Sequence, residues 1–188
     1  MSSKTTGERR WALELTETTR AFPAAASASC RPVARDAGVG IGTLYRHFPT
    51  REALIEAAYR NELARLCGSA ADLVATRPAD AALRTWMDRF IDYLATKRGM
   101  ADALRAVIAS GGDPFAQSRE SLLAAITTLL TAGAADARLR RDVAPADVLA
   151  SLSGVSLIAG APEQRDQAGR LLDLLLDGLR RRPSAGAG

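Results

Sequence analysis

Apolar side chains recur at intervals of three and four residues along almost the whole chain, and runs of β-branched residues are scarce. Alanine, leucine and arginine dominate the composition, and all three favour the α-helix. Glycine and proline residues separate the periodic segments from one another. The pattern therefore predicts an all-α fold of about nine helices, with no convincing strand.

The predicted helices follow one another with clear boundaries. Pro23 ends a first, weak helix over residues 8–22, and Gly38 ends a short second one over about 29–37. A third is expected from Ile41 to Phe48, and Thr50 is expected to cap a fourth that reaches at least Leu66. Five further helices are expected at about 79–95, 100–108, from 115, from 145 and from 162, with a turn at 111–114, a solvated connection at 138–142 and a disordered tail at 183–188.

Length, charge and cysteine content limit the class of protein. The chain has 188 residues, which is enough for one good-sized domain or a small module joined to a larger one. Cys30 and Cys67 are far apart, and there is a single histidine, so neither a disulfide framework nor a metal or cofactor site is expected. Without a leader or a membrane-length apolar run, a soluble, cytoplasmic protein is expected. The net charge of +4 leans to the N-terminal third, which permits a polyanionic partner.

The stretch GVGIGTLYRHFPTREAL, residues 38–54, combines a glycine turn with two short flanking helices. Two helices joined by such a turn make a helix-turn-helix motif, whose second helix enters the major groove of DNA. Thr43, Tyr45 and His47 can donate to phosphates, and Arg46 can do so or read guanine. Phe48 is expected in the core, and Tyr45 fits either packing or contact. The expected DNA-binding residues are Gly42, Thr43, Tyr45, Arg46, His47 and Arg51.

The longer stretch VARDAGVGIGTLYRHFPTREAL closely resembles the helix-turn-helix of the TetR/AcrR family of bacterial transcriptional regulators. The shared pattern is an apolar-Ala pair, Ala-Gly-Val, Thr-Leu-Tyr, an aromatic residue or His before Phe, and a basic residue at the start of the next helix. The resemblance covers residues 33 to about 66. It implies that Thr43, Tyr45 and His47 contact DNA, that Gly42 and Arg46 face the groove, and that Arg51 replaces the family's usual phosphate-binding lysine.

The resemblance also implies an organisation and a function. It implies a DNA-binding domain at residues 1–50 with the motif at about 29–48, and a ligand-binding and dimerisation domain at 51–182. The implied protein is a ligand-responsive regulator, most simply a repressor that binds a palindromic operator in double-stranded DNA as a homodimer. A small apolar or aromatic effector would release it.

The first predicted helix departs from the family pattern. Thr18, Thr19 and the stretch AFPAAASASCRP replace the usual apolar pairs and glycine. Two explanations stay open: a divergent helix, or a disturbance of the reading frame between about Arg9 and Pro32.

Two further sets of residues are expected to act in the C-terminal part. An aromatic and methionine stripe is typical of plain core, and the resemblance adds the reading that it lines an effector pocket: Trp86, Met87, Phe90, Tyr93, Met100, Phe115, Leu122 and Ile126. The leucine stripe of the last helix is too wide for one intramolecular neighbour, which favours a partner chain. The expected dimer interface is Leu149, Leu152, Ser156, Leu172, Leu175, Leu176 and Leu179.

Two other classes of function compete with this interpretation. A small helical enzyme or metal-binding bundle is disfavoured by the single histidine and by the lack of a Glu-x-x-His pair, a phosphate-binding glycine loop or a nucleophile–base pair. A helical sensor or adaptor that has lost DNA binding also fits the pattern. The atypical first helix makes that alternative relevant.

Overall fold

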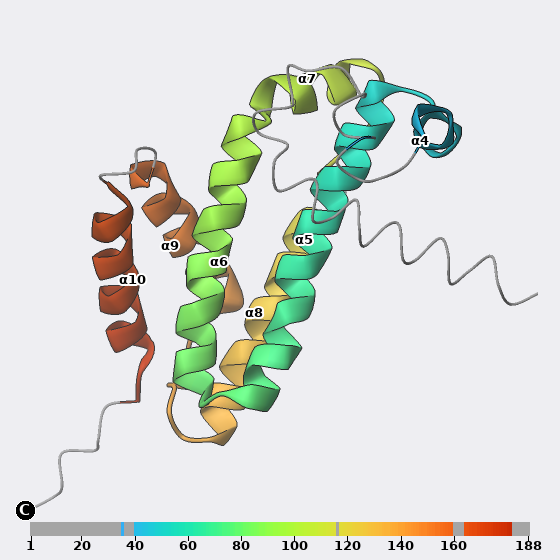
Figure 1. Cartoon of the computed structure of the whole chain (residues 1–188). Helices are drawn as coiled ribbons and strands as arrows, with labels where there is room; N and C mark the ends of the chain where they lie inside the picture. The colour runs from blue at the N-terminus through green and yellow to red at the C-terminus, as the bar shows by residue number, and fades with distance from the viewer. Residues whose placement is uncertain (1–34, 36–39, 116, 160–163, 182–188) are drawn as a thin grey trace, which may run out of the picture. The chain divides into compact units, whose positions relative to one another are not determined.

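A computed structural model describes residues 35, 40–115, 117–159 and 164–181 of the chain (Figure 1). Every regular element in these ranges is a helix, which confirms the all-α class. The helices are α4 (Ile41–His47), α5 (Arg51–Thr76), α6 (Ala79–Gly99), α7 (Ala101–Ala109), α8 (Ser118–Ala135), α9 (Pro145–Ile158) and α10 (Arg165–Leu179). They correspond to the seven helices predicted after residue 40. Apart from Arg35, the two earlier predicted helices lie outside the described residues, as does the predicted tail.

The ends of several helices differ from the prediction, and α6, for example, ends at Gly99 and not near residue 95. Helix α5 continues to Thr76 because Ala70 and Leu73, both buried, extend the apolar stripe beyond Leu66. Helix α8 begins at Ser118 and not near Phe115, because Gln117 has a left-handed backbone with φ of 60°. That conformation is incompatible with a continuous right-handed helix through residue 117.

The described residues form two compact units. The first consists of residues 40–62 and 96–114, and the second consists of 63–95 together with the described parts of 115–181. The division falls within α5 and α6, whereas the family resemblance implies a domain boundary at residue 50. The reason is that Leu54 and Ile55, in the first turn of α5, belong with the buried residues of the first unit.

The first unit contains α4, the start of α5 and α7. Its buried apolar residues are Leu44, Leu54, Ile55, Ala58, Tyr59, Met100, Ala103, Leu104 and Val107. After α7 the chain reverses at Gly111, whose φ of +90° suits glycine. Gly112 then lies against α7, because a Cβ there would be 2.7 Å from Val107 Cγ1. Arg60 of α5 donates to the carbonyl of Asp113 at 3.2 Å and so holds this turn.

The second unit packs α8 against α9 and α9 against α10. Trp86 is fully buried, and its indole N–H donates to the carbonyl of Leu66 at 2.9 Å, which ties α6 to α5. Gly133 near the end of α8 allows a close approach, because a Cβ there would lie 2.3 Å from Leu139 Cδ1. Leu139 fills that space with only 1% of its surface exposed.

The connection at 138–142 is therefore more than the solvated link that its arginines suggest. Leu139 forms an antiparallel bridge with Arg180, the only β-bridge outside strands in the described ranges. Arg140 N donates to Leu179 O at 3.0 Å, and Arg181 N donates to Arg138 O at 2.9 Å. The other four residues of the connection are exposed, as expected, and two of them, Arg140 and Asp142, form an ion pair at 2.6 Å.

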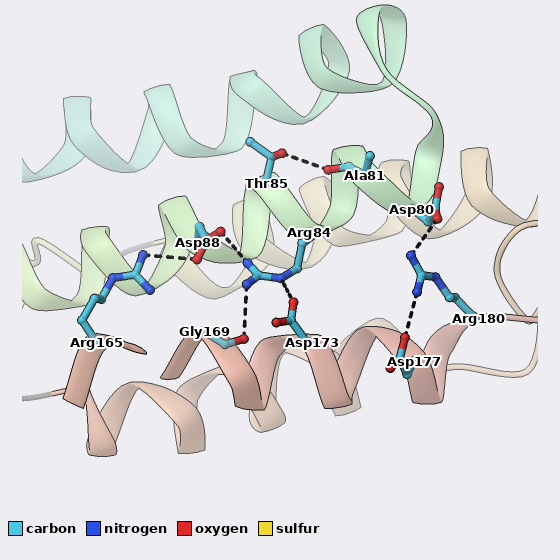
Figure 2. Close-up of polar contacts among 10 residues, drawn as sticks. All are labelled: Asp80, Ala81, Arg84, Thr85, Asp88, Arg165, Gly169, Asp173, Asp177 and Arg180. Carbon is cyan, nitrogen blue, oxygen red and sulfur yellow. Dashed lines mark hydrogen bonds and ion pairs between the residues drawn. The ribbon is translucent and has the colours of Figure 1, made fainter. Parts of the chain in front are cut away.

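A line of ion pairs joins α6 to α10 within the second unit (Figure 2). Arg84 contacts Asp88 on its own helix, and donates to Asp173 at 2.6 Å and to the carbonyl of Gly169 at 3.2 Å. Arg165 reaches Asp88 at 3.2 Å from the start of α10. These contacts fix α10 along α6.

Asp80 lies at the other end of this line, where Arg138 and Arg180 approach it at 3.2 and 3.1 Å. Burial acts to raise the pKa of Asp80, but the hydrogen bond from Arg180 and the charge of Arg138 outweigh it and hold the pKa below its ordinary value. Asp80 therefore keeps its negative charge at neutral pH.

Membrane-spanning helices, metal sites and cysteines are considered next for the residues that the structure describes. None of the helices described there is long and apolar enough to cross a membrane. No group of three or more His, Cys, Asp or Glu side chains in those ranges is arranged to hold a metal ion. Cys67 is a half-buried free thiol, and burial raises its pKa to about 11. Cys30 lies outside the described residues.

Candidate nucleic-acid interface

Helix α4 is bounded by glycine and proline, as the sequence predicts. Gly40 is extended, and its carbonyl accepts hydrogen bonds from the backbone N–H groups of Thr43 at 2.9 Å and Leu44 at 3.1 Å. The helix closes where Phe48 N donates to Leu44 O at 2.8 Å, one residue before Pro49. Helix α4 is thus a short helix that begins after a glycine and ends just before a proline.

The next helix is capped as expected. Thr50 Oγ1 accepts a hydrogen bond from Ala53 N at 3.1 Å, and Glu52 lies in the first turn of α5. Arg51 is half-buried at the first position of this helix. The cap orders the connection from α4 to α5 and with it the backbone of Arg51.

A single side chain of α4 is buried. Leu44 is 2% exposed and anchors the helix in the core of the first unit. Gly42, Thr43, Arg46 and His47 are exposed, and Tyr45 is 48% exposed. The five predicted DNA-binding residues of α4 are therefore all accessible.

This exposed face is suited to a polyanion. Helix α4 has no acidic residue in its first turn, and Arg46 and His47 occupy its last turn. Guanidinium, imidazole, phenol and hydroxyl groups all donate hydrogen bonds, which phosphate oxygens and base edges accept. Phe48, which the sequence assigns to the core, is half-buried. We call Gly42, Thr43, Tyr45, Arg46, His47 and Arg51 the α4 face.

The predicted effector-binding residues belong to well-packed cores. In the second unit, Trp86 and Phe90 stack with ring centroids 5.7 Å apart, and the Phe90 and Tyr93 rings follow at 6.2 Å. Met87, Leu122 and Ile126 are buried in the same unit, and Phe115 is half-buried. Met100 is buried in the first unit. Plain core packing thus describes these side chains in the chain as it stands.

The predicted dimer residues point mostly into their own chain. Leu149, Leu152, Ser156, Leu172, Leu176 and Leu179 are all buried within this single chain, and Leu175 is half-buried. Most of these side chains therefore pack within their own chain, and their part in a dimer interface stays a prediction.

The exposed apolar residues of these helices lie beside the predicted ones. Leu157 on α9 is 81% exposed and Leu174 on α10 is 68% exposed, while Ile158 is also exposed. A Cβ at Gly154 or at Gly178 would meet no described atom within 4 Å, so the backbone is open there. The helical period identifies α10 as amphipathic, whereas α9 is apolar around most of its circumference. The period does not decide which of two adjacent leucines faces inward, and so Leu157 and Leu174 were not predicted.

Comparison with known proteins agrees with this architecture. A family model described as "Bacterial regulatory proteins, tetR family" matches residues 25–58. A second, described as "Transcriptional regulator SbtR-like, C-terminal domain", matches residues 78–181. No curated protein matches the chain.

Solved structures resemble the chain over nearly its whole length. The TetR transcriptional regulator SCO0520 from Streptomyces coelicolor is 53% identical, with a TM-score of 0.86, over 92% of this chain and 99% of that one. A TetR transcription regulatory protein from Mycobacterium vanbaalenii is 27% identical, with a TM-score of 0.71, over 94% and 98%. A TetR transcription regulator from Haloarcula marismortui, at 17% identity and a TM-score of 0.62 over 92% and 99%, shares the fold.

Proposed function

Because the chain belongs to the TetR family of bacterial transcriptional regulators, we propose that it is a repressor that binds a palindromic operator as a homodimer. We further propose that a small apolar or aromatic effector releases it. Family membership makes the chain a transcriptional regulator and not an enzyme. The operator, the dimer and the effector are the parts that need experiment.

The observation that carries the proposal is the α4 face. Leu44 alone anchors the helix, so the remaining side chains of α4 are available to a groove. Arg46 offers a bidentate guanidinium, which can read a guanine edge, and Arg51 adds positive charge where the first N–H groups of α5 begin. In a dimer, two such helices bind successive major grooves when they are roughly 34–36 Å apart.

DNA binding can be tested by band-shift titration with the DNA that flanks the coding region. Arg51→Ala should weaken binding to all sequences. It should also make the negative slope of log K against log salt shallower by about 1.8, because a dimer then neutralises two fewer phosphates and each contributes about −0.9 to the slope. Arg46→Ala should also relax the preference for operator, by about 1–3 kcal/mol for each guanine that is no longer read.

A matched control is available on the other unit. Arg119 on α8 is exposed and has no side-chain partner among the described residues, so Arg119→Ala removes the same charge from the unit that does not contain α4. It should leave operator affinity unchanged. If no complex forms at low salt, or if binding has no salt dependence, the repressor proposal fails and the sensor that has lost DNA binding takes its place.

The dimer is proposed to form through the outward stripes of α9 and α10. Leu157 and Leu174 are large exposed apolar side chains on these adjacent helices, and Gly154 and Gly178 leave room for a second backbone. A two-fold axis would pair each stripe with its copy and remove both leucines from water. The buried leucines beside them support this surface from within.

Sedimentation velocity of aspartate variants tests whether the dimer depends on Leu157 and Leu174 in particular or is disrupted by any added surface charge. Leu157→Asp combined with Leu174→Asp should give folded monomers that no longer retain operator. The control is Ile108→Asp, since Ile108 on α7 is also exposed, at 49%, but belongs to the other unit. A variant that stays dimeric with both aspartates would exclude this surface.

Effector binding is proposed at the aromatic stack of α6. Its walls are apolar and its one indole N–H is already bonded to Leu66, which favours a neutral ligand over an anion. Since the stack is closed in the chain as it stands, the ligand would have to select a differently packed state. Nearly complete release requires about 5.5 kcal/mol of preference for that state.

Trp86 provides the assay. The chain has two tryptophans, so Trp11→Phe leaves Trp86 as the only indole. Neutral aromatic compounds that change its emission should also release operator in the band shift. If only their carboxylated analogues do so, the proposed ligand class is wrong.

A further inference from the structure

A pocket of about 410 Å³ lies in the second unit, lined by the end of α8, the connection that follows α8 and a residue just after α10. None of its lining residues belongs to the aromatic stack of α6. Ala134 and Ala137 from the end of α8 line it together with Leu139, and so do three arginines, Arg140, Arg141 and Arg181. Its volume falls in the range of small-molecule sites, which is roughly 300–1,000 Å³. Apolar and cationic walls therefore meet in one cavity.

The walls are held by backbone contacts before any ligand arrives. The two segments that carry the arginines pair through the bridge between Leu139 and Arg180, with hydrogen bonds of 2.9 and 3.0 Å on either side. Leu139 in turn packs on Gly133, where any side chain would collide with it. A site with a fixed backbone loses little conformational entropy when it binds.

Most arginines in these segments already have an anionic partner. Arg138 and Arg180 pair with Asp80, at 3.2 and 3.1 Å. Arg140 donates twice to Asp142, at 2.8 and 2.6 Å, and this bidentate pair neutralises its charge.

Arg141 and Arg181 differ from their neighbours. Both are exposed, both line the pocket, and neither has a carboxylate partner among residues 40–115, 117–159 and 164–181. Two cations beside one cavity repel each other, and an anion between them removes that repulsion. The excess charge of the two arginines is then +2, which a phosphate monoester, with a charge of about −1.5 to −2 at neutral pH, would balance.

We propose that this pocket binds a small phosphomonoester, with its phosphate between Arg141 and Arg181 and its organic group against Ala134, Ala137 and Leu139. Planar guanidinium groups bind phosphate oxygens in pairs, which makes arginine well suited to this role. The site is separate from the neutral-effector site proposed above and does not depend on DNA binding. It would give the regulator a second chemical input.

Isothermal titration calorimetry of the full chain with phenyl phosphate tests the proposal. Saturable binding of one equivalent per chain is expected, tighter than for inorganic phosphate, which lacks the apolar group, and tighter than for benzoate, which has a single charge. Arg141→Ala and Arg181→Ala should each weaken it by at least about tenfold, which corresponds to 1.4 kcal/mol. Arg119→Ala, an equal loss of charge on the same unit, should leave it unchanged.

A structural role for these arginines would give a different result. If Arg141 and Arg181 act only in binding, both alanine variants should unfold at the parent temperature without ligand and lose the stabilisation that phenyl phosphate gives the parent. Failure of phenyl phosphate to bind at millimolar concentration would overturn the proposal. So would equal losses in all three alanine variants, or equal affinity for the three probes.

Discussion

The contact between Gly133 and Leu139 predicts that Gly133→Ala lowers the free energy of unfolding, and that this loss disappears when the Leu139 side chain is removed. In Gly133→Ala, the new methyl group would lie 2.3 Å from Leu139 Cδ1 and 2.4 Å from its Cγ, far inside van der Waals contact. Leu139 is buried and tied to Arg180 by the bridge, so it has little freedom to withdraw. Overpacking of this kind costs about 1–3 kcal/mol.

Alanine also favours the helix over glycine by no more than about 1 kcal/mol. The net loss in the free energy of unfolding should therefore be about 1–2 kcal/mol. In a chain of this length that corresponds to a decrease of roughly 2–8 °C in Tm. Urea unfolding followed by far-UV circular dichroism measures the loss in the free energy of unfolding.

The double mutant tests the reasoning. Leu139→Ala alone should cost about 2–5 kcal/mol, because it opens a cavity beside α8. In that background Gly133→Ala should become neutral or stabilising, since the colliding atoms are gone and only the helix preference remains. If the loss caused by Gly133→Ala is the same with and without Leu139, the proposed collision is not its cause.

Two further predictions concern stability. Ala137 has φ of 55°, a left-handed backbone that costs an ordinary residue about 1–2 kcal/mol, so Ala137→Gly should raise the free energy of unfolding by about 0.5–1 kcal/mol in thermal melts; a loss would contradict this. Asp80→Asn should lower stability at neutral pH by about 1–2 kcal/mol, because it breaks the contacts with Arg138 and Arg180. Since the folded pKa of Asp80 lies below the unfolded value, its contribution is present above the unfolded pKa and is lost as the pH falls through the folded one. Stability curves of parent and variant should converge in acid, and parallel curves would refute the assignment.

Helical periodicity was sufficient to predict much of the fold. The seven helices after residue 40, the Thr50 cap and the break at Pro49 all follow from local preferences, which short stretches of sequence contain. Exposure of Gly42, Thr43, Arg46 and His47 followed in the same way, since they lie off the apolar stripe of Leu44, whereas the sequence left Tyr45 open and Arg51 is half-buried. The family model for the N-terminal part begins at residue 25 and leaves the expected first helix, 8–22, unmatched.

Long-range contacts account for what the sequence did not predict. Leu139 looks solvated among arginines, but its partners are Gly133 and Arg180, and Arg180 is distant in the chain. The leucines of α10 form a stripe wider than one neighbour covers, and only the packing of α9 shows that Leu172 and Leu176 face inward while Leu174 does not. The unneutralised pair Arg141 and Arg181 becomes visible only once the partners of their neighbours are known.

The ion pairs between α6 and α10 also set the register in which the two helices meet. Asp80, Arg84 and Asp88 follow at intervals of four residues on α6, so the charge alternates in sign from one helical turn to the next (Figure 2). A slide of α10 by one turn in either direction would separate Asp80 from Arg180 and Asp88 from Arg165. The ion pairs therefore fix the position of α10, which carries Leu174, along the axis of α6. In a dimer that forms through α10, both chains would present Leu174 at the same position.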